Sequence, residues 1–184
     1  MNTGLIAQRY AKALLKLVQE SDAGEKVYSQ ACVLVQRMQE IRQLADVIQK
    51  HPEVSLEKKT DILDSALGEP MASQLHRFVS LVHQNRRIEH FGRMLYSFVD
   101  QYRTVNNIKL GHLITASEVS GLKDRLQDAL SERMGMKVIL EEHVDPDVYG
   151  GFVLSVGDLR MDASVSAQFR QLRHELIEND NRIV

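Results

Sequence analysis

The chain has 184 residues, of which 43% are hydrophobic and 26% are charged, values typical of a folded protein with one domain or two small ones. Lys and Arg number 23 against 25 Asp and Glu, and this near balance, a formal net charge of −2, excludes a strong long-range attraction to nucleic acid or anionic lipid. The sequence has no apolar tract of about 20 residues that could span a bilayer, and no N-terminal secretion signal is expected. Because Cys32 is the single cysteine, an internal disulfide and a thiolate metal cluster are excluded.

The first predicted helix covers residues 5–20 and is apolar around more of its circumference than a surface helix needs. At about 100° per residue, its polar side chains occupy an arc of roughly 120° and its apolar side chains roughly 200°, against the ~100° stripe that faces a single core. Leu5 is the one apolar residue within the polar arc. Two interpretations follow: the helix is central among its neighbours, which the helical wheel alone favours, or part of its apolar surface receives a helix of another protein.

Helical spacing continues through the rest of the first half. Apolar residues three and four apart predict five more helices, over 25–40, 41–50, 56–67, 71–84 and 88–102. A break is expected near Glu40, Ser55 is expected to cap the fourth helix, and Gly68 is expected to end it. Since no strand pattern occurs among them, residues 1–105 are predicted to form an all-α six-helix bundle.

The hydrophobic period changes after the pair Asn106-Asn107, which marks the predicted boundary between two domains. Residues 108–115 alternate in the manner of a strand. Further patterns predict, in order, a helix ended by Gly135, strands over 138–144 and 152–156, a short return strand over 159–161, and a last helix capped by Asp162 or Ser164. Residues 108–184 are therefore predicted to form a small α+β domain of the order strand-helix-strand-strand-helix.

The patterns that enzymes require are missing from this sequence. No Gly-rich loop with a Lys follows a predicted strand, so no nucleotide-phosphate site is expected, and the Gly150-Gly151 pair indicates backbone that packs too closely for side chains. His143, Asp145 and Asp147 could be metal ligands, but their strand-to-turn context favours a solvated turn. No spacing suggests a catalytic triad. The sequence thus predicts no catalytic, cofactor-binding or metal-binding residue.

Five short motifs accompany this order of elements. They are Arg9-Tyr-Ala-Lys-Ala-Leu14, Asn85-Arg86, Asp145-Pro146 with Tyr149-Gly-Gly-Phe152, Val156-Gly-Asp158 and Asp162-Ala-Ser-Val165. Each motif alone is weak, but the ordered set is specific and spans essentially the whole chain. On the basis of this ordered set of motifs, the chain resembles the delta subunit family of bacterial F-type ATP synthases. These subunits are counterparts of the mitochondrial oligomycin-sensitivity-conferring protein.

This resemblance implies a non-catalytic stator protein that joins the crown of the catalytic head to the peripheral stalk, so that rotor torque drives ATP synthesis or proton pumping. The helical domain would receive N-terminal helices of alpha subunits in a groove between its first and fifth helices. The α+β domain would hold the C-terminal ends of the b subunits. Because the b subunits are anchored in the membrane, the protein would be peripheral, at the cytoplasmic face of the cell membrane, and would reach the bilayer only through its partners.

The residues that the resemblance carries over form two groups. The groove candidates are Ala7, Tyr10, Ala11, Leu14, Phe78, Leu81 and Val82. The residues expected to shape structural motifs are Asn85, Arg86, Gly150, Gly151, Asp162 and Ser164. No cofactor and no metal are implied.

Two other functions fit parts of the sequence. Arg86 and Arg87 next to a helical domain would suit a generic helical adaptor or an RNA-binding regulatory protein. The balanced charge argues against nucleic acid as the partner. A hydrolase that uses His143 and the nearby acids is a remote third alternative.

Overall fold

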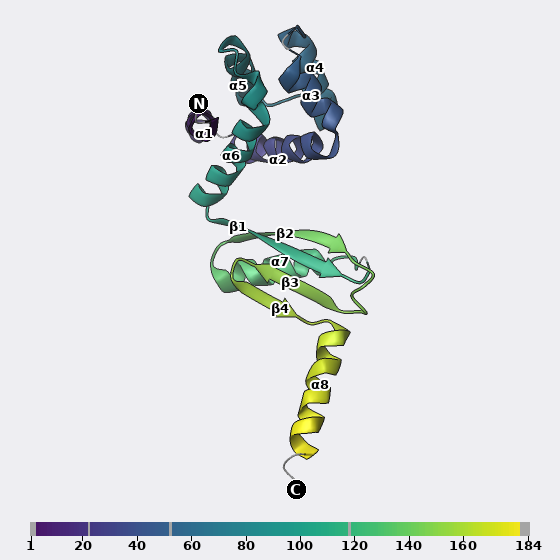
Figure 1. Cartoon of the computed structure of the whole chain (residues 1–184). Coiled ribbons are helices and arrows are strands. Elements are labelled where there is room, and N and C mark those ends of the chain that lie inside the picture. Colours follow the sequence, from purple (N-terminus) through teal and green to yellow (C-terminus); the bar gives the residue numbers. More distant parts are fainter. Residues whose placement is uncertain (1–2, 22, 52, 118, 181–184) are drawn as a thin grey trace. The chain divides into compact units, whose positions relative to one another are not determined.

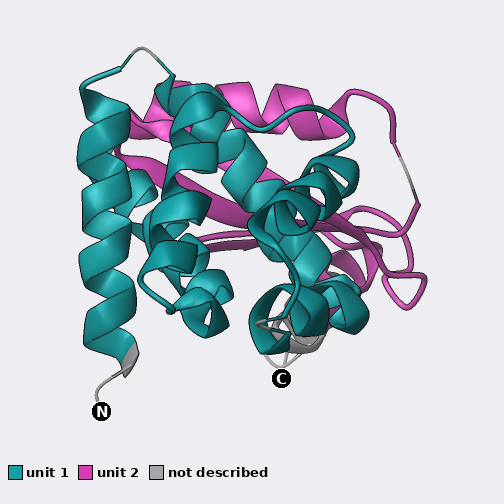
Figure 2. Ribbon diagram, turned by 90° about the horizontal axis from the view of Figure 1, so that it is seen from above, with its two compact units in different colours: residues 1–106 teal, residues 107–184 magenta. Residues whose placement is uncertain are grey.

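The computed structural model describes residues 3–21, 23–51, 53–117 and 119–180. The chain divides into two compact units, residues 1–106 and residues 107–184 (Figure 2). Over the described ranges, the first unit contains only helices, and the second combines a four-stranded sheet with two helices (Figure 1). The predicted combination of a helical part with a small α+β part is therefore confirmed.

The first unit follows the helical spacing of its sequence. Its described elements are α1 (Thr3–Gln19), α2 (Gly24–Glu40), α3 (Arg42–Lys50), α4 (Leu56–Leu67), α5 (Ser73–Gln84), the 3-10 turn η1 (Ile88–His90) and α6 (Phe91–Val105). The predicted break near Glu40 is confirmed, because Ile41 has the non-helical angles φ −108° and ψ 89°. Ser55 Oγ accepts the N–H of Lys58 at 3.4 Å, and Gly68 ends α4 with a φ of 75°, so both predicted caps are also confirmed.

Helix α1 is central within the first unit, where it packs against α2, α5 and α6. Ala11 and Leu14 are fully buried and Val18 almost so. In contrast, Leu5 is 59% exposed and Tyr10 is half-buried. Most of the apolar surface of α1 is therefore covered by neighbouring helices, as expected for a central helix. One strip beside α5 stays exposed.

A buried lysine joins two helices of the first unit. The side chain of Lys59 in α4 is 0% exposed, and its Nζ donates a hydrogen bond to the carbonyl of Ile48 at 3.0 Å. Burial lowers the pKa of Lys59, and the nearby carboxylate of Glu53 opposes that shift. Because the last carbonyls of a helix lack partners within it, the ammonium group of Lys59 completes the C-terminal turn of α3. The hydropathy pattern gave no indication of this role.

Replacing Lys59 with alanine is expected to destabilise the first unit by about 2 kcal/mol, the range for losing a hydrogen bond to a charged group. The substitution also removes the buried aliphatic stem that fills the space between α3 and α4. Urea unfolding followed by circular dichroism measures the change. The matched control is Lys58→Ala, an exposed neighbour in the same helix, and equal midpoints for the two variants would contradict the role of Lys59.

The second unit contains one mixed sheet. Its elements are β1 (Ile108–Thr115), α7 (Leu122–Met134), β2 (Lys137–Val144), β3 (Phe152–Val156), β4 (Leu159–Asp162) and α8 (Val165–Asp180). The strand order is β2-β1-β3-β4, with β1 parallel to β2 and the other pairs antiparallel. A parallel pair needs a crossover connection, which α7 provides. The expected return strand is β4.

One face of the sheet forms the core of the second unit with α7. Leu113, Leu140 and Leu154 come from three adjacent strands and meet Leu130 of α7. Strand residues two positions apart share a face, so His112, which neighbours Leu113, lies on the opposite face and is exposed. One face of the sheet is therefore covered by α7, and the other exposes His112 to solvent.

Two residues connect the units, because α6 ends at Val105 and β1 begins at Ile108. The side-chain amide of Asn106 donates a hydrogen bond to the carbonyl of Tyr102 at 2.8 Å. Asn107 has a φ of 52°, a conformation that asparagine adopts more readily than most residues. The change from helix to strand is thus completed within these two positions.

Candidate functional site

A groove lies between α1 and α5, with a volume of about 430 Å³. Its lining consists of Leu5, Ile6, Arg9, Tyr10 and Ala13 from α1, Leu81 from α5, and Asn85 and Arg87 from the turn after α5. Leu5 is 59% exposed and Leu81 44% exposed, which is unusual for two large apolar side chains that line one hollow. The groove therefore exposes large apolar side chains together with two cations, Arg9 and Arg87.

Only two of the seven predicted groove residues line this groove, namely Tyr10 and Leu81. The structure corrects the other five assignments, because these side chains are at most 4% exposed and lie in the interior of the first unit. The buried five are Ala7, Ala11, Leu14, Phe78 and Val82. Ala7, Ala11 and Leu14 face inward because α1 packs on α2, α5 and α6. Phe78 and Val82 belong to α5, which packs on α1, α4 and η1.

The groove also contains residues that the sequence analysis missed, chiefly Leu5, Ile6 and Ala13 of α1. One signal could have found them. Leu5 is the single apolar residue within the polar arc of its helix, and an apolar side chain on a polar face has no core to join within its own unit. An isolated apolar residue within a polar arc therefore predicts the exposed groove better than the residues at the centre of the apolar arc do.

The turn after α5 shapes one end of the groove. The N–H of Asn85 donates to the carbonyl of Leu81 at 3.1 Å, and the N–H of Arg87 donates to the carbonyl of Val82 at 3.0 Å. Arg86 lies between them with a φ of 55°, so it reverses the chain as a left-handed residue at the end of a helix. The predicted structural role of the Asn85-Arg86 pair corresponds to this turn.

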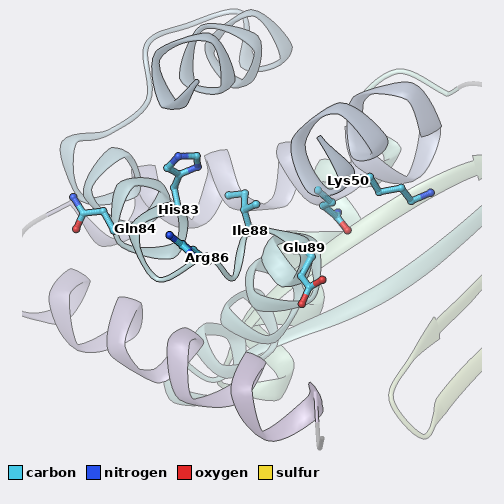
Figure 3. A pocket seen from close by; sticks show the side chains of 7 residues that line it. Lys50, His83, Gln84, Arg86, Ile88 and Glu89 are labelled. Carbon is cyan, nitrogen blue, oxygen red and sulfur yellow. The ribbon is translucent and has the colours of Figure 1, made fainter. Parts of the chain in front are cut away.

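A second hollow, of about 850 Å³, borders the same turn at Arg86. Figure 3 shows Lys50, His83, Arg86 and Glu89 around it, together with Gln84 and Ile88. Because charged, amide and imidazole side chains make up most of this lining, the hollow is more polar than the groove. Arg86 and Arg87 thus belong to different hollows and do not form one basic patch.

The C-terminal motif residues build a tight junction between β4 and α8. Ser164 Oγ accepts the N–H of Ala167 at 3.2 Å and donates to a carboxylate oxygen of Asp162 at 2.6 Å. The expectation that Ser164 or Asp162 caps the last helix is confirmed, with Ser164 as the capping residue and Asp162 as its support. Nearby, the carbonyl of Gly150 accepts the N–H of Val165 at 3.0 Å. These residues have a structural role.

The Asp162 carboxylate predicts a pH dependence of stability. Its hydrogen bonds from the hydroxyl and N–H of Ser164, assisted by Arg170, lower the pKa of Asp162 below its usual range. A carboxyl whose pKa is lower in the folded state stabilises the protein above its unfolded pKa of about 3.9, and this stabilisation is lost as the pH falls through the folded pKa. Asp162→Asn is therefore expected to lower the urea midpoint at pH 7.

The same midpoint difference between Asp162→Asn and the parent chain is expected to shrink as the pH falls below about 4, and to disappear once the pH has passed through the lowered pKa of the folded parent carboxyl. Urea titrations at several pH values measure it. Asp158→Asn, in the exposed turn between β3 and β4, is the matched control. A difference that stays constant down to a pH of about 2 would contradict the assignment.

Comparison with known proteins identifies the family. The family described as "ATP synthase delta (OSCP) subunit" matches residues 6–176. The chain belongs to this family. The ATP synthase subunit delta of Phocaeicola vulgatus is 33% identical over 100% of both chains, and that of Bacteroides fragilis is 32% identical over the same shares. A chain of the Toxoplasma gondii mitochondrial ATP synthase hexamer has the same fold, with a TM-score of 0.58, 19% identity and coverage of 93% and 97% of the two chains.

As a delta (OSCP) subunit, the protein is a non-catalytic component of the F-type ATP synthase, in the peripheral stalk that links the catalytic head to the stator. It therefore interacts with other subunits of that membrane-associated complex. Within the part of the chain that the structure describes, no helix is long and apolar enough to cross a bilayer. The family assignment replaces the alternatives of a generic adaptor, an RNA-binding regulator and a hydrolase.

Proposed function

We propose that the groove between α1 and α5 receives the N-terminal helix of an alpha subunit of the catalytic head. The observation that carries this proposal is the open apolar strip, where Leu5 of α1 and Leu81 of α5 are exposed on the two sides of one groove. The α1 residues that line it extend from Leu5 to Ala13, about 12 Å of helix at 1.5 Å per residue. That length suits two to three turns of an amphipathic partner helix laid into a groove.

The charges of the groove define the partner further. Arg9 and Arg87 lie in the lining, and no acidic side chain is among the described residues that line it. An incoming helix with acidic residues beside its apolar anchors would therefore complement the groove. The apolar anchors supply most of the affinity, and the cations orient the helix.

The second unit is proposed to hold the C-terminal ends of the b subunits, at the cytoplasmic face of the membrane. Large apolar side chains remain exposed near the junction of β4 and α8, including Met161 and Phe169. Large apolar side chains that remain exposed are typical of surfaces that other chains cover. The b subunits are anchored in the membrane, so binding them would attach this protein to the membrane indirectly.

The mechanism is mechanical. Torque from the rotor would turn the catalytic head together with the rotor unless a stator opposed it. The protein opposes it by binding the head through one unit and the stalk through the other. A nanomolar grip corresponds to about −12 kcal/mol, which a few well-packed apolar anchors provide.

Isothermal titration calorimetry of the full chain tests the groove. The ligand is a peptide that copies the first ~20 residues of the alpha subunit from the same organism, long enough for a helix of about 30 Å. We expect saturable one-to-one binding with a dissociation constant of about 1 µM or below. A scrambled peptide of identical composition is the control. If the native peptide binds no better than the scrambled one, the groove does not serve the alpha subunit.

A further inference from the structure

Three exposed side chains with metal-ligating atoms gather on the open face of the sheet. They are His112 of β1 and Glu141 and His143 of β2, and the nearest ligand atoms of the three all lie within 4.8 Å of one another. Nδ1 of His112 is 3.7 Å from a carboxylate oxygen of Glu141, and the two imidazole rings are 6.2 Å apart between centroids. No other group of three such residues occurs within the described ranges.

The backbone holds this cluster together. In the parallel pairing of β1 with β2, His112 is directly opposite Glu141, and Ile114 is opposite His143. Because side chains two positions apart share a face, all three potential ligands project from the same side. The other side is fixed against α7 by the core around Leu113, so neither strand can rotate to separate them.

The residue types select the metal. Two imidazole nitrogens with one carboxylate oxygen form a three-ligand set that zinc accepts, with a water molecule in the fourth position. Magnesium and calcium prefer sites made entirely of oxygen ligands. Donors in a tetrahedral zinc site lie about 3.4 Å apart, and rotation of the exposed side chains brings the three ligands from their present spacing to that distance.

We propose that His112, Glu141 and His143 form a zinc-binding site on the sheet of the second unit. The metal would connect the edge strand β2 to its neighbour β1 and so stabilise the folded unit by mass action. This site is independent of the groove in the first unit and of the proposed contact with the alpha subunit. It also differs from the turn with Asp145 and Asp147, neither of which joins the cluster.

Calorimetric titration of the chelator-treated full chain with zinc chloride tests the site. We expect one zinc ion per chain with a dissociation constant of about 10 µM, and no binding of magnesium at comparable concentrations. His112→Ala and His143→Ala should each weaken zinc binding about 30-fold or more, since each removes one of three ligands. The matched control is His76→Ala, an exposed histidine of α5 outside the cluster.

Thermal unfolding provides a second measurement that does not depend on heats of binding. Zinc at 100 times its dissociation constant should raise the melting temperature of the parent chain and of His76→Ala, and should raise that of His112→Ala by at most about a third as much. Because the ligands are exposed, all variants should melt alike when chelator is present. Zinc binding weaker than about 1 mM, or binding that the His112→Ala/His143→Ala double variant retains, would overturn the proposal.

Discussion

Tyr10→Asp is expected to weaken binding of the alpha-subunit peptide at least 100-fold, a loss of about 3 kcal/mol. Tyr10 is half-buried in the lining of the groove, where a partner helix would remove its remaining exposed surface from water. A carboxylate at that position would have to lose its hydration against apolar neighbours, and the aromatic anchor would be missing. Calorimetry with the full-chain variant measures the loss.

Two further variants separate the groove from the rest of the surface. Leu81→Asp places a charge on the α5 side of the same groove and should weaken the peptide to a similar degree. Tyr96→Asp changes an aromatic residue of α6 that is 62% exposed outside the groove, and it should leave the affinity unchanged. If Tyr10→Asp and Leu81→Asp bind the peptide as tightly as Tyr96→Asp does, the peptide binds elsewhere.

Gly151→Ala is expected to destabilise the second unit by about 4 kcal/mol, combining the cost of a left-handed backbone with that of overpacking. Gly151 has a φ of 78°, which L side chains rarely adopt. In addition, a Cβ atom there would overlap the carbonyl oxygen of Ala163 and crowd the backbone of Ser164. Since both obstacles are backbone atoms, no side-chain rotation relieves them. Urea unfolding of the full chain measures the effect.

Gly157→Ala separates the two causes. Gly157 also has a positive φ, 56°, but a Cβ atom there meets nothing within 4 Å. This variant should therefore lose only the conformational part, about 1–2 kcal/mol. Equal losses at Gly151 and Gly157 would show that the approach of Ala163 to Gly151 is unimportant.

Local pattern predicts the elements of this fold because each element carries its own period. The spacing of apolar residues located the helices, and Ser55 and Gly68 marked the ends of α4 through conformations that depend on few neighbours. The alternation of 108–115 identified a strand. It did not reveal that α7 covers the face with Leu113 and leaves His112 open, because both faces of that strand carry apolar residues.

The groove was harder to predict because its lining depends on how neighbouring helices pack. A helical wheel gives the direction of each side chain but not the neighbour that covers it, so Ala11 and Leu14 could not be distinguished from true groove residues. Lys59 is the opposite case, since a charged side chain in a helix normally indicates a solvated surface. Its burial depends on the nearby end of α3, which no local pattern contains.

The junction between α6 and β1 has a consequence for a protein that transmits force. Only Asn106 and Asn107 separate the last helical residue from the first strand residue. Fully stretched, two residues span about 7 Å. A force applied to one unit is therefore transmitted to the other after almost no extension of this two-residue connection. The connection consequently stores little elastic energy between successive steps of the rotor.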